Sequence, residues 1–597
     1  MRKGTTSVMT KFRAILLILA VCFLTFGPTL KNEFIGDSKA LFVGNDFYKS
    51  PANLARLFKK DFITDLSRFD NTGPFSGCVS YRPVTALTFF WDYALWKENP
   101  FGHNLTNVLL HALASGLVFI LIGLLGSGSP VALLAALLFA AHPVQAEAVN
   151  VVGYRSDLLA TVAYLFAFIF YIRFIRADSP RDRPALGLSY LFFFLAVFSK
   201  ENAVTLPFVL FLCDYWFLND RPFSHFIFKR SKYYVGFFSI LIFYLLVYVF
   251  VFPSAFYPKM PLLGQTRVEH FIYIAQIFLL YLKALLWPFG VRPLPPLYLP
   301  ALSSLGWLEG LLGMTVVILF LISSSALFSR QRTVAFAALW FLANYLPVSN
   351  ILPLLNPYAY RMLYLPSVGF FWLLALLIDN VAGRLQTRAD TPVKAFAGAL
   401  IAVLLVSTTL RLNHYFRNDV TACRAMIRFY PDSSRPYWVL GHHFYMNGDY
   451  ETAAGYLRQF LQNKKERNPF LSQAKQQFMG HHLLARAYMP IDPKKAIEEL
   501  QVTIGIYDGE AVVFADLAKA YIAVKDYDNV LKNARRAYEL NPRLGIAYVY
   551  AVHALVETGR LKEAFGELEN AKAVFPNDPN IKIVEDYLNE KAKAAPP

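Results

Sequence analysis

Charged residues are scarce in this chain of 597 residues. They make up 17% of the sequence, against roughly 25% in soluble domains, while hydrophobic residues make up 56% and aromatic residues 16%. This composition excludes a single soluble domain and predicts a polytopic membrane protein with a soluble part. The net charge of +17 does not indicate a nucleic-acid partner. Much of the excess lies in short loops between apolar runs, where basic residues set the orientation of a membrane protein.

Cysteine is also scarce, and so are the motifs of nucleotide chemistry. The four cysteines form no CxxC pair and no zinc-ligand spacing, so neither a disulfide framework nor a structural zinc site is expected. The sequence has no P-loop, no GxSxG elbow and no dinucleotide fingerprint. A donor linked to a lipid phosphate fits this absence.

Apolar runs of membrane-spanning length are abundant instead. Twelve candidates fall near 14–30, 105–125, 131–149, 157–175, 186–198, 203–218, 234–252, 271–288, 307–328, 333–347, 361–378 and 395–412. The basic flank before the first run predicts a retained first helix with its N-terminus in the cytoplasm. Twelve crossings would place the basic clusters around Arg330 and Arg388 outside, against the positive-inside rule. If the run at 271–288, which a proline-rich stretch follows, does not cross, both clusters return inside, so we predict about eleven spans.

The C-terminal part has a different pattern. Long apolar runs end, charge rises, and a repeat of about 34 residues begins, which is the tetratricopeptide (TPR) length. We therefore expect an all-α protein with a polytopic transmembrane domain at 1–425 and about four repeats at 426–597. Stacked repeats of this kind form a surface that usually binds a polypeptide, although these could also be no more than a folded tail.

A few ionisable residues lie at the ends of the apolar runs. Such groups cost several kcal/mol near a bilayer unless they are paired or used, so they are functional candidates. With eleven spans, one non-cytoplasmic face carries the first outer loop (31–82) and also Asp37, Arg82, Arg155, Lys200, Glu201 and Arg361. Convergence at one face would make a single polar site.

Asp37 and four basic residues are the main candidates in this site. A carboxylate just after the first span could act as a general base towards a hydroxyl, or could be a helix-terminal acid in water. Arg82, Arg155, Lys200 and Arg361 could bind the phosphate of a lipid-linked ligand. Arg82 could equally extend to the lipid headgroups.

Further polar residues lie beside these positions. His103, Asn107 and His111 share one helix face, as a metal site or as a polar seam between packed helices. His142, Glu147 and Asp157 flank Arg155 and could orient a phosphate or form a structural salt-bridge cluster. Glu201 and Tyr364 adjoin Lys200 and Arg361. We predict no bound metal at these residues and no certain cofactor, with a divalent metal as a possibility.

Five stretches of this sequence resemble a known family. They are SYRPVTALTF (Ser80 to Phe89), HNLTNVLLH (His103 to His111), FAAHPVQAEAVNVVGYRSDLLA (Phe139 to Ala160), FSKEN (Phe198 to Asn202) and RMLYLPSVGF (Arg361 to Phe370). Their order, with repeats at the C-terminus, is similar to the TMTC proteins. These are transmembrane and tetratricopeptide-repeat O-mannosyltransferases of the GT-C type.

The resemblance implies a glycosyltransferase that takes a sugar from a polyprenyl or dolichyl phosphate. It implies that Asp37 is the catalytic carboxylate, and that Arg155, Lys200 and Arg361 lie near the lipid phosphate. The family often has paired acids where this chain has Gly36-Asp37-Ser38, so a two-acid or metal role does not carry over. We expect a protein acceptor bound through the repeats, in a bacterial inner membrane with periplasmic repeats, or alternatively in the endoplasmic reticulum.

Two other functions stay open from the sequence. One is a polysaccharide ligase or polymerase that uses a lipid diphosphate. The other is a membrane-anchored scaffold whose repeats recruit a partner without catalysis.

Overall fold

The computed structural model describes most of the chain. The described residues are 2–43, 46–58, 81–176, 184–218, 223–251, 263, 266–293, 304–326, 331–354, 356–384, 390–463, 473–576 and 579–594. All regular secondary structure in these ranges is helical, which confirms the predicted all-α class. The described residues separate into two compact units, which meet in the sequence between Tyr430 and Pro431.

The predicted boundary between residues 425 and 426 falls inside a helix, α18 (Asp419–Phe429). The last turn of α18 packs within the first unit. The ring of Phe429 contacts Tyr415 at a centroid distance of 5.9 Å, and the Arg292 guanidinium lies 5.5 Å from the Phe429 ring centre. The two units divide five residues after the predicted boundary, between Tyr430 and Pro431.

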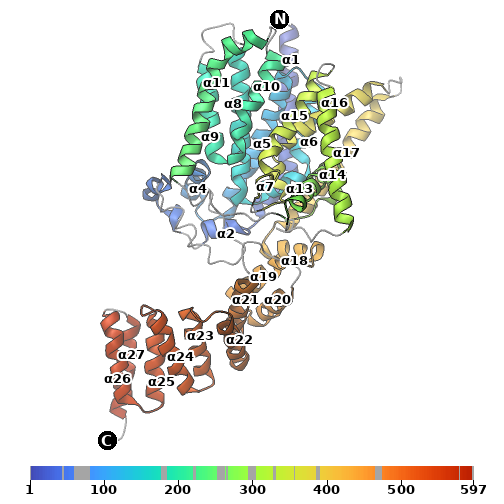
Figure 1. The fold of residues 1–597 in the computed structure, drawn as a ribbon. Helices are drawn as coiled ribbons and strands as arrows, with labels where there is room; N and C mark the ends of the chain where they lie inside the picture. The colour runs from blue at the N-terminus through green and yellow to red at the C-terminus, as the bar shows by residue number, and fades with distance from the viewer. Residues whose placement is uncertain are drawn as a thin grey trace. The chain divides into compact units, whose positions relative to one another are not determined.

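The first unit is a bundle of long apolar helices (Figure 1). Its main helices are α1 (Arg2–Phe26), α4 (Pro83–Trp96), α5 (Pro100–Leu124), α6 (Ser129–Ala141), α8 (Arg155–Ile175), α9 (Pro184–Ser199), α10 (Leu206–Cys213), α11 (Phe223–Leu246), α13 (Arg267–Leu286), α14 (Ser304–Ala326), α15 (Arg332–Tyr345), α16 (Ser367–Arg384) and α17 (Asp390–Tyr415). One large hydrophobic core runs through the unit and includes Trp340 and Trp372, both almost fully buried.

The helices identify an integral membrane protein. Among the described residues, five segments are long and apolar enough to cross a membrane: Lys11–Lys31, Pro100–Leu124, Val152–Ile175, Arg230–Phe250 and Arg267–Leu286. A pair of helices joined by a bend would be a sixth if the pair forms one span. Arg267–Leu286 covers the run that we expected not to cross, and by length and composition it could cross. The count of eleven spans stays a prediction.

The bent pair breaks the apolar run that the sequence presents at 131–149. Helix α6 ends at Ala141, and a bend of 51° separates it from the short helical segment Pro143–Asn150. Pro143 explains the break, because the residue before a proline is disfavoured in the α conformation. A similar interruption precedes α16, which begins at Ser367, so Arg361 lies in a 3₁₀ turn, η13 (Tyr360–Leu363), rather than in a spanning helix.

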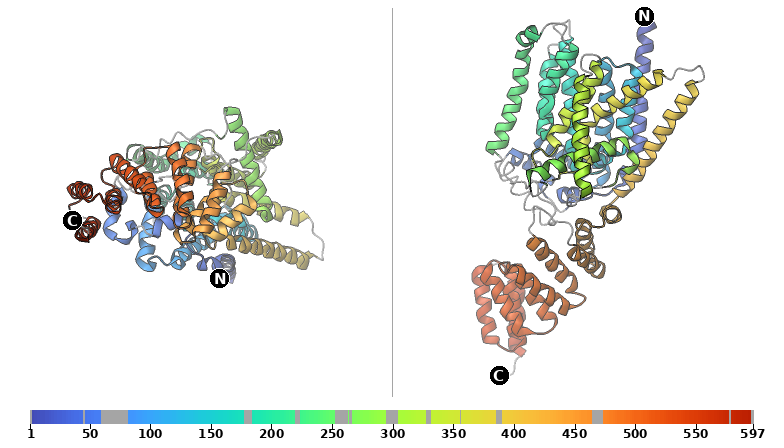
Figure 2. Two further views of the ribbon diagram at one scale, coloured as in Figure 1. Left: turned by 90° about the horizontal axis from the view of Figure 1, so that it is seen from below. Right: turned by 45° about the vertical axis from the view of Figure 1, so that its right-hand side comes forward.

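The second unit is a row of antiparallel helix pairs. They are α19 (Arg435–Met446) with α20 (Tyr450–Gln462), α21 (Gln473–Tyr488) with α22 (Pro493–Ile506), α23 (Ala511–Ala523) with α24 (Tyr527–Leu540), and α25 (Gly545–Glu557) with α26 (Leu561–Val574). A single helix, α27 (Pro579–Ala594), follows, and the row is drawn in brown to red in Figure 2. The four pairs lie between residues 435 and 574, within the stretch 426–597 for which repeats were predicted.

Small residues let the paired helices approach closely. A Cβ added to Gly441 in α19 would lie 2.6 Å from Cγ of Leu457 in α20. The turns inside the first and fourth pairs place Gly448 and Gly559 at φ values of 79° and 73°. Glycine adopts this left-handed conformation without steric cost, so each pair can reverse direction within a few residues.

Candidate functional site

The polar candidates gather at one end of the first unit. Helices α2 (Asp37–Phe42) and α4 and the short α7 (Ala146–Asn150) lie at the end of the bundle opposite the N-terminal end of α1 (Figure 1). The positions at which the helices begin or end explain this gathering: Arg82 precedes α4, Arg155 begins α8, Lys200 follows α9 and Arg361 precedes α16.

Arg82 lies at the partly exposed edge of this cluster. Its Nε and Nη2 donate to the two carboxylate oxygens of Glu201 at 3.2 and 2.7 Å, and its Nη1 donates to the Ser156 hydroxyl at 3.3 Å. Partial loss of water contact by itself would raise the pKa of the half-exposed Glu201, but the neighbouring charges of Arg82 and Lys200 outweigh it and lower that pKa to about 2. The Glu201 carboxylate therefore remains charged and holds the Arg82 guanidinium in place.

Lys200 and Arg361 are each held by a buried carboxylate. The Lys200 ammonium donates to Oδ1 of Asp157 at 2.5 Å. Arg361 forms an ion pair with Glu147, and its backbone N–H donates to the same carboxylate at 3.3 Å. The Arg361 guanidinium also lies 4.0 Å from the centre of the Tyr154 ring, a favourable cation–π contact.

The segment Tyr154–Asp157 connects the three cations: Ser156 accepts from Arg82, Asp157 accepts from Lys200, and the Tyr154 ring lies against Arg361. Asp157 is almost fully buried. Its Oδ2 has no hydrogen-bond partner among the described residues. Three carboxylates balance the charge of the three cations. Two ammonium N–H groups of Lys200, and the Nε and Nη2 groups of Arg361, still make no hydrogen bond within the described part. Cations fixed in this way retain donors for an anionic ligand.

Arg155 has a different environment. Its side chain is fully buried, and its N–H groups donate to Asn107 Oδ1 at 2.8 Å, Asp92 Oδ2 at 2.6 Å and the His103 carbonyl at 3.0 Å. Weaker contacts at 3.3 and 3.5 Å reach Thr88. No donor is left for a ligand, so this geometry does not fit the phosphate contact that the sequence suggested. Arg155 joins α4, α5 and α8 instead.

The histidines on α5 form a seam between helices. His103 Nε2 lies 2.9 Å from the Lys97 carbonyl, and His111 lies 2.8 Å from the Tyr364 hydroxyl and 3.1 Å from the Ala140 carbonyl. His142 accepts the Val144 N–H through Nδ1 at 3.2 Å. These contacts place His103 and His111 between packed helices. No group of three or more histidine, cysteine, aspartate or glutamate side chains among the described residues could hold a metal ion.

Asp37 begins α2, directly after Gly36 at φ 52°. Its side chain lies outside the described part of the structure. The segment around it is well anchored: the Gly153 N–H donates to the Ser38 hydroxyl at 3.0 Å, and the His103 ring packs against Phe34 and Phe42 at 5.2 and 4.4 Å. Ser38 thereby holds α2 against the turn that contains Tyr154, whose ring lies against Arg361.

Several residues of this region were missed in the sequence. Asp92 is 3% exposed and accepts from Arg155 and, at 2.9 Å, from the Thr106 hydroxyl. An acid inside the apolar stretch Thr88–Trp96 is a signal that could have found it. Three asparagines also form a buried chain, from Asn32 to Asn150 at 3.0 Å and from Asn150 to Asn413 at 2.7 Å. No sequence pattern links residues this far apart.

The sequence is similar to proteins named O-mannosyl-transferases. Protein O-mannosyl-transferase F38B6.6 of Caenorhabditis elegans is 24% identical over 440 residues, 72% of this chain and 59% of the relative. Tmtc3 of Drosophila melanogaster is 25% identical over 541 residues, 77% of this chain and 56% of the relative. TMTC3 of Homo sapiens is 30% identical over 194 residues, 32% of this chain and 20% of the relative.

The chain thus spans less than two thirds of the length of these curated relatives. No family model matches it. Among solved structures, the crystal structure of the APC/C hetero-tetramer Cut9-Hcn1 aligns over 89% of this chain and 92% of that chain. Its sequence identity is 13% and its TM-score 0.24, too low to indicate a shared fold.

Proposed function

We propose that this protein is a membrane glycosyltransferase of the GT-C type. It moves a sugar, with mannose as the first candidate, from a polyprenyl phosphate to a hydroxyl group of a protein acceptor outside the cytoplasm. The observation that carries the proposal is the cluster of Arg82, Lys200 and Arg361 around the segment Tyr154–Asp157, at the end of the bundle where Asp37 begins α2. The similarity to O-mannosyl-transferases supports the reaction type.

The cations bind the phosphate of the donor. Arginine donates in a fork that matches phosphate oxygens, and lysine adds a point charge. Arg82 and Arg361 are partly exposed, with side chains 26% and 11% accessible, so a headgroup at the membrane surface can reach them. Lys200 lies deeper, at 8%. Because carboxylates already orient these groups, little reorganisation is needed as negative charge develops on the leaving phosphate.

Asp37 acts on the acceptor. In the transfer step, the bond between the anomeric carbon and the phosphate oxygen breaks, and a bond from the acceptor oxygen to that carbon forms. The hydroxyl proton passes to the Asp37 carboxylate, and the polyprenyl phosphate leaves with the bonding electron pair. General-base catalysis of this kind contributes typically 10²- to 10⁴-fold.

The repeats present the acceptor. Rows of paired helices expose a continuous surface that suits an extended polypeptide. This role, and the placing of the repeats and the loop at 31–82 on the periplasmic side of a bacterial inner membrane, belong to the proposal. An endoplasmic reticulum membrane with lumenal repeats is the alternative location.

The choice of sugar donor and the size of the glycan formed test the proposed function. Purified protein in nanodiscs is given a polyprenyl-phosphate sugar or the corresponding diphosphate, with a secreted protein fraction as acceptor. We expect single sugars on protein from the monophosphate only. Transfer from the diphosphate with growth of a long glycan would instead support the ligase or polymerase, and no transfer from either donor would contradict an enzyme.

Sidedness is tested by cysteine labelling in a cysteine-free background. Single cysteines replace Glu33, Glu98 and Leu352, which are exposed on segments near the cluster, and Ser231, which is exposed at the start of the span Arg230–Phe250. An impermeant maleimide added to intact cells should label the first three and leave Ser231 unlabelled. Labelling of Ser231 alone would place the cluster in the cytoplasm and contradict the proposed site.

A further inference from the structure

We infer that Asp419 is a positioning residue for the segment that carries Asp37. The inference rests on the proposed function, in which Asp37 accepts the acceptor proton. Asp419 is the first residue of α18, some 380 positions away in the sequence. One carboxylate contacts the chain on both sides of Asp37, at residues 36 and 39, and so fixes the start of α2.

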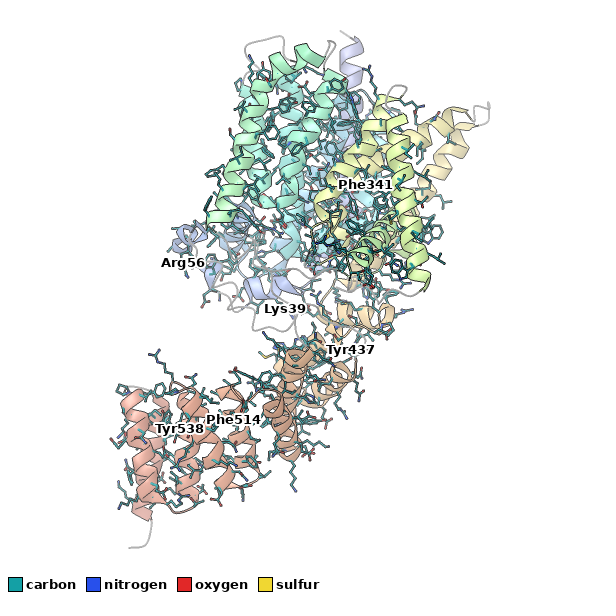
Figure 3. The ribbon with its side chains drawn as sticks, viewed as in Figure 1. Lys39, Arg56, Phe341, Tyr437, Phe514 and Tyr538 are labelled. Atoms are coloured by element: carbon teal, nitrogen blue, oxygen red, sulfur yellow. The ribbon has the colours of Figure 1, made fainter. Side chains whose placement is uncertain are left out.

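Two contacts make this clamp. Oδ1 of Asp419 accepts the Gly36 backbone N–H at 2.9 Å, and Oδ2 lies 2.9 Å from the Lys39 ammonium. The Asp419 side chain is 11% exposed and that of Lys39 38%. Lys39 is labelled on α2 in Figure 3. A backbone contact reinforces the arrangement, because the Glu33 N–H donates to the Arg417 carbonyl at 2.9 Å.

The clamp is needed because the chain before Asp37 has an unusual conformation. Gly36 has φ 52° and ψ −130°, in a region that residues other than glycine rarely adopt. Among the described residues, no atom outside its neighbours in the chain lies within 4 Å of the position that a Gly36 Cβ would take. The hydrogen bond to Asp419 is the side-chain contact that holds the Gly36 N–H, between the buried residues Ile35 and Ser38.

The N-cap of α18 does not require Asp419. The helix already has an N-cap in Asn418, whose side chain accepts the Thr421 N–H at 2.9 Å. The Asn418 N–H in turn donates to the Thr421 hydroxyl at 3.2 Å. This reciprocal arrangement satisfies the helix start. The Asp419 carboxylate is free to point outward and accept from Gly36 and Lys39.

The first readout is the position of residue 37 itself. Asp37→Cys is made in the full-length protein with its four native cysteines replaced, and the rate of its alkylation is measured with Asp419 intact and with Asp419→Ala. We expect Asp419→Ala to change this rate by about tenfold or more, from the loss of a hydrogen bond to a charged acceptor. Lys39→Gln, which leaves α18 untouched, should change it by about twofold, because that ion pair is partly exposed.

Asp46→Ala is the matched control. Asp46 is 89% exposed and forms an ion pair with Lys49 at 3.1 Å in the same outer loop. Its removal should leave the alkylation rate of residue 37 unchanged. If Asp419→Ala and Lys39→Gln behave like Asp46→Ala, the clamp does not position this segment and the inference is overturned, whatever the activity.

The second readout is transfer kinetics with Asp37 in place. A displaced base lowers kcat but leaves the donor KM unchanged, because the phosphate is bound by other residues. Asp419→Asn retains an acceptor for Gly36 and should retain more of kcat than Asp419→Ala. If alkylation changes while kcat does not, Asp419 positions a segment that transfer does not use. The catalytic part of the inference and the role of Asp37 in the proposed function then fail together.

Discussion

Arg155→Met should destabilise the membrane unit rather than weaken donor binding. Arg155 is fully buried, and its main partner Asp92 is 3% exposed. Without the guanidinium, Asp92 retains the Thr106 hydroxyl and the His103 ring nitrogen at 3.5 Å, neither of which supplies a permanent positive charge. Removing one partner of a buried ion pair costs about 3–5 kcal/mol. At about 1.4 kcal/mol per factor of ten, the ratio of folded to unfolded protein falls roughly a hundredfold to several thousandfold.

A second substitution tests whether the unpaired charge of Asp92 causes the destabilisation. Asp92→Asn in the Arg155→Met protein removes the uncompensated charge, so the double variant should be more stable than Arg155→Met alone by at least about 1 kcal/mol. Arg82→Met serves as the comparison, because its partner Glu201 is half exposed and such pairs contribute about 0–1 kcal/mol.

The assay is the rate of irreversible unfolding in detergent at a fixed temperature, followed by loss of the monodisperse peak on size-exclusion chromatography. Donor KM is measured on the protein that remains folded. If Arg155→Met unfolds at the wild-type rate but has a donor KM raised tenfold or more, Arg155 binds the phosphate and the structural assignment is refuted.

Three further predictions concern single positions. Arg82→Gln should raise the donor KM by roughly 10- to 100-fold through loss of a charged hydrogen bond, and an unchanged KM in a donor titration would exclude Arg82 from the site. Because the pKa of Glu201 is lowered to about 2, its contribution to stability is complete above its unfolded value of about 4.3 and disappears as the pH falls towards 2. The wild type should accordingly lose more thermal stability than Glu201→Gln between pH 6 and pH 3, and parallel losses would contradict this. Gly369→Ala should abolish folding, since its Cβ would lie 2.5 Å from the Ala337 carbonyl oxygen and 2.7 Å from the backbone N of Phe341, a residue labelled in Figure 3. Gly383→Ala in the same helix has open space and should fold like the wild type on size-exclusion chromatography.

The sequence was most informative where its pattern is local. Apolar length and the 34-residue repeat depend on neighbouring residues, and the all-α class and the helix pairs follow from them. The gathering of Arg82, Lys200 and Arg361 was predicted from the number of membrane spans and the positive-inside rule, which placed all three on one side of the membrane. No sequence pattern links the three residues. The structure brings these residues together, although the number of spans used in that reasoning stays a prediction.

The pairings could not be predicted, because they join distant positions. Arg155 and Asp92 are 63 residues apart, and a sequence with several unpaired acids offers no rule for choosing Asp92. A buried arginine and a ligand-binding arginine have the same local signature at the start of a helix. Burial distinguishes them, and burial depends on how α4, α5 and α8 pack.

Sugar transfer by Asp37→Asn tests the proposed role of Asp37 most directly. The variant and the control Asp46→Asn are expressed to equal levels, and transfer from a polyprenyl-phosphate sugar to protein is measured in membranes with saturating donor. We predict a loss of at least about 100-fold for Asp37→Asn, as expected for removal of a general base, with wild-type activity for Asp46→Asn. Full activity of Asp37→Asn would show that Asp37 is not the general base.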